Sequence, residues 1–138
     1  MEFNKDIIEQ VNRNPLYQAM GISIETAKGG AVTSSLKPEP AMCWPFAGQP
    51  HGGVLFTLMD TTMAWAAISG QEKAGSCTTI HLDIQYIRPA RGAAFSCRAE
   101  VVSQTTRISF LSASIFDADG QLLATGQGTY RLMNGSIV

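Results

Sequence analysis

The sequence contains few of the residues that metal centres and disulfide frameworks require. Its 138 residues include two histidines and three cysteines, and the cysteines (Cys43, Cys77 and Cys97) are odd in number and widely spaced. Zinc sites and disulfide frameworks need clustered or paired ligands, so neither is predicted. We expect reduced thiols that are mostly buried, and no metal site.

An excess of one charge is also lacking. Ten basic and eleven acidic residues give a net charge of −1 and are mixed along the chain. Without a basic stripe, a nucleic-acid partner is not expected. No apolar run has transmembrane length, and the charged first 14 residues lack the apolar segment of a signal peptide. These absences predict a cytoplasmic protein with no membrane partner.

The chain does have enough apolar residues (45%) to bury a core, and its length is typical of one domain, residues 1–138. Residues 6–13 have the apolar spacing of a short helix that ends before Asn14-Pro15. Two strands then flank a turn at residues 28–30, the second covering 31–36. A loop with four prolines follows from 37 to 50, and loops of this length are often functional.

Residues 54–68 predict the one long helix. Apolar side chains surround most of its circumference, which is typical of a helix buried on nearly all sides. Its small and polar side chains fall at i, i+3, i+4 and i+7 and form one narrow stripe: Thr57, Asp60, Thr61 and Ala64. Burying Asp60 in such a helix needs an explanation, because an unpaired carboxylate is costly to desolvate.

After this helix the apolar period changes to two. In residues 79–87, Ile80, Leu82, Ile84 and Tyr86 alternate with polar side chains, which predicts a half-buried strand with Thr79 on its polar face. Three more strands are predicted at 95–101, 108–116 and 121–132, with a hairpin turn at 117–120. The order predicts an α+β fold, a curved antiparallel sheet wrapped around one long central helix.

The same order carries a motif at the start of the central helix. Gly48-x-x-His51-Gly52-Gly53 is followed by an acid at Asp60, and the next strand ends in Tyr86-Ile87-Arg88-Pro89-Ala90. Together these features resemble the hotdog-fold acyl-CoA thioesterases, most closely the phenylacetate-pathway branch of the 4-hydroxybenzoyl-CoA thioesterase superfamily. The resemblance covers about residues 16–132.

The resemblance implies roles for the motif residues. Gly52 would donate its N–H to the thioester oxygen, and Gly53 would let the carbonyl approach the backbone because it has no Cβ. Losing one such donor costs ~10²–10³ in rate. Asp60 would be either a general base acting on water or a nucleophile. His51 would support the loop, although a catalytic role stays open.

The resemblance also implies an assembly. Gly52 and Asp60 are eight residues apart, about 12 Å along a helix axis, which is too far to act on one carbonyl. Related enzymes pair the glycine of one subunit with the acid of the other, so a homodimer or a dimer of dimers is expected.

Further substrate contacts are expected from several positions. Relatives place an Asn or Gln where this chain has Pro45, and Gln49 is close enough in sequence to replace it. Thr79 aligns with a hydroxyl residue of the relatives, and arginines bind phosphates of the kind coenzyme A carries. Met-rich walls adapt to many acyl shapes. The residues expected to contact substrate are His51, Gly53, Gln49, Thr79, Phe56, Met63, Arg88 and Arg107.

Three functions remain open at this point. The first is hydrolysis of an acyl-CoA or aryl-acyl-CoA to the free acid and coenzyme A, with no cofactor because coenzyme A is part of the substrate. The second is a non-catalytic hotdog module that binds acyl-CoA. The third is a dehydratase of the same fold, although its usual motif is not found here. A purely structural Asp60 is the corresponding alternative at the level of the residue.

Overall fold

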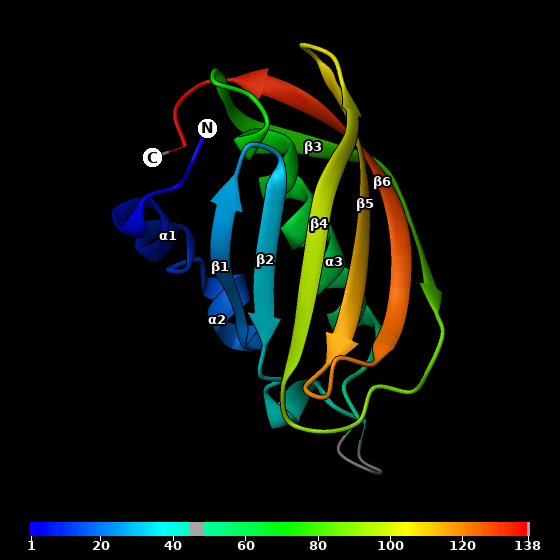
Figure 1. Cartoon of the computed structure of the whole chain (residues 1–138). Coiled ribbons are helices and arrows are strands. Elements are labelled where there is room, and N and C mark those ends of the chain that lie inside the picture. The colour runs from blue at the N-terminus through cyan, green and yellow to red at the C-terminus, as the bar shows by residue number, and fades with distance from the viewer. Residues whose placement is uncertain (45–48, 138) are drawn as a thin grey trace.

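The computed structural model describes residues 1–44 and 49–137, in which one sheet wraps around one helix (Figure 1). The helices are α1 (Lys5–Val11), α2 (Pro15–Met20), the 3₁₀ turn η1 (Pro40–Met42) and α3 (Gly52–Ser69). The strands are β1 (Ile22–Lys28), β2 (Ala31–Leu36), β3 (Ala74–Tyr86), β4 (Phe95–Gln104), β5 (Ile108–Asp117) and β6 (Leu122–Asn134). The α+β hotdog arrangement expected from the sequence is confirmed.

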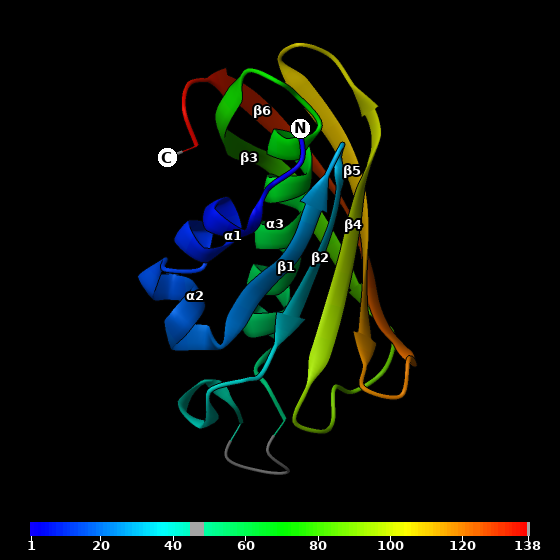
Figure 2. The same ribbon diagram turned by 60° about the vertical axis from the view of Figure 1, so that its left-hand side comes forward.

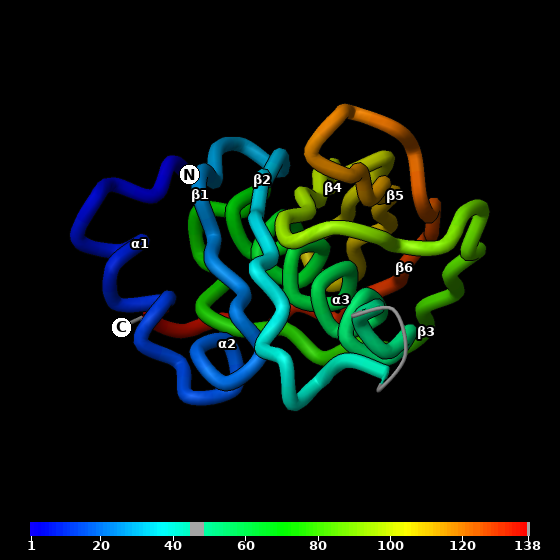
Figure 3. The backbone as a smooth tube through the Cα atoms, turned by 90° about the horizontal axis from the view of Figure 1, so that it is seen from below, coloured from blue at the N-terminus to red at the C-terminus, as the bar shows by residue number. Residues whose placement is uncertain are grey.

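The six strands form a single antiparallel sheet in the order β1-β2-β4-β5-β6-β3. Figure 2 shows α3 on the concave side of this sheet, and Figure 3 shows its turns in the middle of the molecule with strands around them. The apolar circumference of α3 is therefore buried, with Leu58, Met59 and Met63 all 0% exposed. β3 lies at one end of the strand order, so one of its edges is unpaired within the described chain.

Two glycines of β6 let α3 approach the sheet closely. A Cβ at Gly126 would collide with the sulfur of Met59, and one at Gly128 would lie 3.0 Å from the terminal methyl of Met63. Protein cores do not tolerate such overlaps without a shift of the helix or the strand. These glycines hold the middle of α3, including Asp60, next to β6.

The helix α2 was not predicted from the sequence, where residues 16–26 are mixed and only Ile22 and Ile24 alternate with polar side chains. Asn14 caps α2 with its side chain, which accepts from the N–H of Leu16, and Pro15 occupies the first turn. Gly21 ends the helix with φ 84°, a left-handed conformation that glycine adopts readily. The Asn14-Pro15 pair therefore ends the first helical segment and also begins the second.

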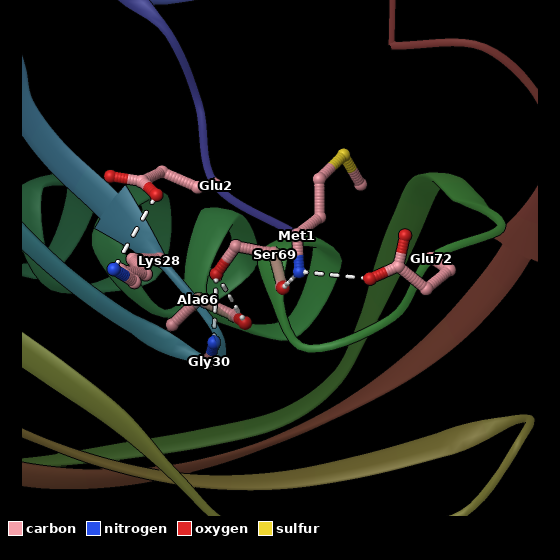
Figure 4. A network of polar contacts seen from close by, with 7 residues as sticks. All are labelled: Met1, Glu2, Lys28, Gly30, Ala66, Ser69 and Glu72. Atoms are coloured by element: carbon pink, nitrogen blue, oxygen red, sulfur yellow. Dashed lines mark hydrogen bonds and ion pairs between the residues drawn. The ribbon is translucent and has the colours of Figure 1, made fainter.

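The C-terminal end of α3 is anchored by the first residues of the chain and by the β1–β2 turn (Figure 4). The nitrogen of Met1 donates to the Ser69 carbonyl at 2.9 Å and lies 3.5 Å from the Glu72 carboxylate. The Gly30 N–H donates to the Ser69 hydroxyl at 3.1 Å. A positive group near helix carbonyls is favourable because that end of a helix carries a partial negative charge.

Candidate active site

The His-Gly-Gly start of α3 is built so that one backbone N–H remains available. His51 is the N-cap residue, and its Nδ1 accepts from the Gly53 N–H at 2.8 Å. The first N–H groups of a helix have no partner further along the helix axis. Here the His51 side chain accepts from Gly53, and the His51 carbonyl accepts from Val54 at 2.8 Å. No described residue accepts from the Gly52 N–H. This donor lies at the positive end of an 18-residue helix.

The ring of His51 is held in one orientation. Trp44 stacks on it with ring centroids 4.6 Å apart and an interplanar angle of 32°. Since Nδ1 accepts a hydrogen bond, a neutral His51 carries its proton on Nε2. Nδ1 is therefore already engaged with the helix start. In this arrangement the imidazole shapes the first turn of α3, and the supporting role of His51 stays a prediction.

Gly52 lines a cavity of about 520 Å³. Its walls come from the loop before α3, the first turn of α3 and the chain after β3: Trp44, Gln49, Pro50, His51, Gly52, Leu55, Tyr86, Ile87, Arg88, Pro89 and Ala90. Trp44 and His51 also line a second cavity of about 460 Å³, whose other walls include Met20, Met42 and Val54. The Trp44–His51 stack therefore contributes to both cavities.

Tyr86 is a site residue that sequence reasoning did not single out. Its hydroxyl donates to the Gly52 carbonyl at 2.6 Å, and its ring would lie 3.4–3.7 Å from a Cβ at position 52. Burial raises the pKa of Tyr86, so its hydroxyl stays a donor at neutral pH. Tyr86 joins the end of β3 to the first turn of α3. The available signal was its position at the end of the strand that follows the helix.

Asp60 lies half-buried in the middle of α3 and accepts two hydroxyl hydrogen bonds on the same oxygen. Thr79 of β3 donates to Oδ1 at 2.8 Å, and Tyr130 of β6 donates to Oδ1 at 2.8 Å. No described residue donates to Oδ2. A buried or half-buried carboxylate is tolerable only with such partners. The arrangement fixes the carboxylate and leaves one oxygen open.

Thr79 reaches Asp60 because β3 contains a bulge. The pairing with β6 shifts between Thr79, which faces Tyr130, and His81, which faces Thr129. The predicted alternation put Thr79 on the same face as His81 and Asp83, and this was wrong. An extra residue in one strand reverses the alternation of its side chains. Thr79 therefore points to the helix side, while Ile80 is 58% exposed.

The other reactive side chains near Asp60 are not nucleophiles at neutral pH. Burial and the negative charge of Asp60 raise the pKa of Cys77 to about 12. Burial raises the pKa of Tyr130 well above its usual value, and the Asp60 charge and hydrogen bond raise it further. The thiol and the phenol both stay protonated. Asp60 is the group at this position that can take a proton or attack a carbonyl.

The remaining candidates are distributed differently from expectation. Gln49 and Arg88 line the cavity at Gly52, and Arg88 also donates to the Leu122 carbonyl at 2.8 Å. Phe56 is 37% exposed on α3 and is not a wall of this cavity. Met63 is fully buried beside Gly128, so the expectation that it contacts substrate does not hold within the chain.

Arg107 lies far from the Gly52 cavity within one chain. It belongs to the β4–β5 connection, which is at the opposite end of the sheet from the start of α3 in Figure 1. There it lines a polar cavity together with Arg131. Pro45 and Gly48, which the sequence analysis named, lie outside the described part of the chain.

No group of three or more potential metal ligands occurs among the described residues. In the same residues, no helix is long and apolar enough to cross a membrane. The cysteines at positions 43, 77 and 97 are free thiols.

Comparison with known proteins decides the family. Residues 48–124, which include the start of α3, Asp60 and Thr79, match the family described as the Thioesterase superfamily. The chain belongs to this superfamily. The resemblance drawn from His51-Gly52-Gly53 and Asp60 is therefore confirmed.

The relatives of this superfamily member are distant in sequence and close in fold. A Halobacterium salinarum protein named "Putative esterase VNG_1336C" is 30% identical over 131 residues, covering 88% of this chain and 87% of that protein. The E. coli PaaI protein from the phenylacetic acid degradation operon has a TM-score of 0.83 at 21% identity, covering 96% and 95% of the two chains. A Streptococcus pneumoniae thioesterase protein solved with coenzyme A has a TM-score of 0.79 at 18% identity, covering 94% and 98%. These two structural likenesses concern the fold.

Proposed function

We propose that this thioesterase-superfamily protein hydrolyses an acyl-CoA or aryl-acyl-CoA thioester to the free acid and coenzyme A. The observation that carries the proposal is that two groups on α3 have no hydrogen-bond partner among the described residues: the Gly52 N–H at its start and Oδ2 of Asp60 in its middle. The first is a donor for a developing oxyanion, and the second is a base or nucleophile. Thioester hydrolysis needs both.

The reaction begins with the thioester carbonyl oxygen accepting from the Gly52 N–H. This hydrogen bond strengthens as the oxygen becomes negative, and the positive end of α3 adds to the effect. In the general-base route, Asp60 takes a proton from a water whose oxygen attacks the carbonyl carbon. The C–S bond then breaks, the thiolate of coenzyme A takes a proton, and the acid is released. In the nucleophilic route, Asp60 attacks the carbonyl carbon, the C–S bond breaks, and the coenzyme A thiolate leaves and takes a proton. Water then hydrolyses the resulting anhydride to the free acid and Asp60.

The spacing of the two groups requires a second copy of the chain. Eight residues of helix separate Gly52 from Asp60 by about 12 Å, so they cannot contact one carbonyl group. Two features of one protomer are available for contact with a second copy. They are the unpaired edge of β3 and the half-exposed stripe of Thr57, Asp60 and Ala64 on α3. A two-fold dimer repeats the same contact in both directions and creates two composite sites.

The proposed dimer makes a direct prediction. Light scattering at low micromolar protein concentration should give a mass of twice or four times that of the 14.8 kDa chain. A folded monomer with full activity would contradict the composite site.

The coenzyme A moiety is proposed to extend from the Gly52 cavity. Arg88 lines this cavity, and only part of its guanidinium is used by the Leu122 carbonyl, so further N–H groups are available for phosphate oxygens. The structural relative solved with coenzyme A supports this class of ligand. Arg107 and Arg131 form a second basic position that one protomer could offer to the site of its partner.

The test is a thiol-release assay with purified protein and a panel of acyl-CoAs that covers short, medium and aromatic acyl groups. We expect release of free coenzyme A with a kcat that depends on the acyl group. If the acyl-CoAs bind and no thiol is released, the non-catalytic binding module is the correct function instead.

Trp44 offers a separate prediction about acyl selectivity. It is 41% exposed, stacks on His51 and lines both cavities beside the first turn of α3. Replacing Trp44 with Ala removes a large aromatic wall that both cavities share and leaves Gly52 and Asp60 unchanged. We expect the order of preferred acyl-CoAs to change more than the best kcat falls. An equal loss for every substrate would assign Trp44 to the folding of the loop.

A further inference from the structure

Tyr130 is the largest fully buried side chain near the candidate site, and it ends on Asp60. Its exposed fraction is 0%, and its hydroxyl lies 2.8 Å from Oδ1 and 3.2 Å from the backbone carbonyl oxygen of Asp60. The shorter contact is to the carboxylate. One side chain therefore touches both the main chain and the side chain of Asp60.

The ring of Tyr130 cannot easily move. A Cβ at Gly128, two residues earlier on the same face of β6, would lie 2.7 Å from its Cε2 atom. The absence of that Cβ creates the space the ring occupies, and the same Cβ would lie 3.0–3.1 Å from the end of Met63. Close packing of this kind holds a side chain in one rotamer. The phenolic oxygen is therefore a fixed point on β6.

Thr79 supplies a second fixed point from β3. It faces Tyr130 directly in the β3–β6 pairing, so the two hydroxyls approach the same oxygen of Asp60 from adjacent strands. A carboxylate without such partners rotates through a broad, two-fold torsional range. With both hydrogen bonds on Oδ1, rotation would break two contacts at once.

We propose that Tyr130 is a positioning residue for the reaction: with Thr79 it holds Oδ1 of Asp60 and thereby presents Oδ2 to the water or the thioester. This inference rests on the proposed function. The reacting oxygen of Asp60 is then Oδ2, to which no described residue donates a hydrogen bond. Misplacing a reacting group by about 1 Å costs up to ~10²-fold in rate, so an anchored carboxylate matters for kcat.

The phenol suits this role because it stays a donor. Burial raises the pKa of Tyr130, and the neighbouring Asp60 charge raises it further. A protonated hydroxyl next to a carboxylate donates a charge-assisted hydrogen bond, which is stronger than a neutral one. Tyr130 therefore stays a hydrogen-bond donor at neutral pH.

A purely structural role for the Tyr130 hydroxyl is the competing explanation, since buried tyrosine hydroxyls usually find a partner. Tyr17 provides the matched control. It is also buried, and its hydroxyl accepts from the indole N–H of Trp65 at 2.9 Å, on the α2 side of α3. Tyr17→Phe removes a buried phenolic oxygen without removing a hydrogen bond to the Asp60 carboxylate.

The experiment compares Tyr130→Phe, Tyr17→Phe and Asp60→Asn, with Tyr130→Phe also made in the Asp60→Asn background. For each variant, kcat, KM and melting temperature are measured on one preparation. We expect Tyr130→Phe to lower kcat by about 10- to 100-fold at nearly constant KM, because orientation is lost and substrate binding is not. Tyr17→Phe should keep the wild-type kcat even if its melting temperature falls.

The double variant isolates the coupling. If Tyr130 acts through the Asp60 carboxylate, adding Tyr130→Phe to the Asp60→Asn variant should not lower its residual rate any further. A folded Tyr130→Phe variant with the wild-type kcat would overturn the inference, and so would an equal fold-loss in both backgrounds. If Asp60→Asn itself retains full kcat, Asp60 is not the reacting group and the positioning role of Tyr130 fails with it. If the wild-type protein releases no thiol from any acyl-CoA, the proposed function fails instead.

A second pair of variants keeps the test decisive if Tyr130→Phe does not fold. Thr79 is exposed on β3 and donates to the same oxygen, so Thr79→Val removes a donor with little effect on the core. Thr79→Ser retains the hydroxyl. We expect kcat to fall in the valine variant and to be restored in the serine variant, and equal values in both would contradict the anchoring of Oδ1.

Discussion

Replacing Asp60 with Asn should lower kcat by ~10²–10⁴, the range for loss of a positioned acid–base group. The amide has almost the same shape, and its oxygen can still accept from Thr79 and Tyr130, which now donate to Oδ1. What it loses is the basic, charged oxygen at the Oδ2 position. Affinity for coenzyme A should change little, because the proposed site for the phosphates and pantetheine, at Arg88, is separate from the carboxylate.

The variant should remain folded. A half-buried carboxylate costs free energy to desolvate, and an amide costs less, so the melting temperature should hold or rise. Asp83→Asn is the matched control, because Asp83 is an exposed β3 acid whose partner is His81 at 3.3 Å. If Asp60→Asn melts lower while its folded fraction turns over normally, Asp60 is structural.

Replacing Gly52 with Pro should lower kcat by ~10²–10³, the cost of removing one oxyanion donor. Gly52 is the first residue of α3, where a helix tolerates proline, and His51 has φ −56° and ψ 140°, which a following proline favours. The helix should therefore form with its oxyanion N–H removed. Turnover of the wild type and the variant across the acyl-CoA panel measures the effect.

Gly52→Ala is the control for this substitution. Its added Cβ would lie 3.4 Å from the Tyr86 hydroxyl oxygen, an ordinary contact, and its N–H is retained. We expect Gly52→Ala to keep most of the wild-type kcat. A higher KM in Gly52→Pro at unchanged kcat would indicate that the proline ring merely blocks the cavity.

Mixing the two inactive variants tests whether each site is shared between protomers. In a mixed dimer of Asp60→Asn and Gly52→Pro, one composite site has both native residues and the other has neither. Random exchange makes half of the dimers mixed, so activity should recover to about one quarter of the wild-type value. A site made within one protomer would show no recovery.

The sequence was sufficient for the order of the strands, for the central helix and for the family, although the short helix α2 was missed. Local patterns made these predictions possible: a helix apolar on nearly every side must be buried, and alternating residues must form strands with two different faces. His51-Gly52-Gly53 and Asp60 were found because a helix start with two glycines and an acid in an apolar helix both contradict local preferences. Such contradictions are typical of functional sites.

The sequence by itself determined the central helix, the antiparallel strands and the proposed pair of Gly52 and Asp60, because each of these depends on residues close together in the chain. Only the tertiary structure decided which groups hold Asp60. Tyr130 lies 70 residues away from it, and Thr79 reaches it through a bulge that reverses the predicted face of the strand. The bulge depends on how β3 pairs with β6, and the place of Tyr130 depends on the space left by Gly128. Both result from packing between distant segments, which alternation within one segment does not encode.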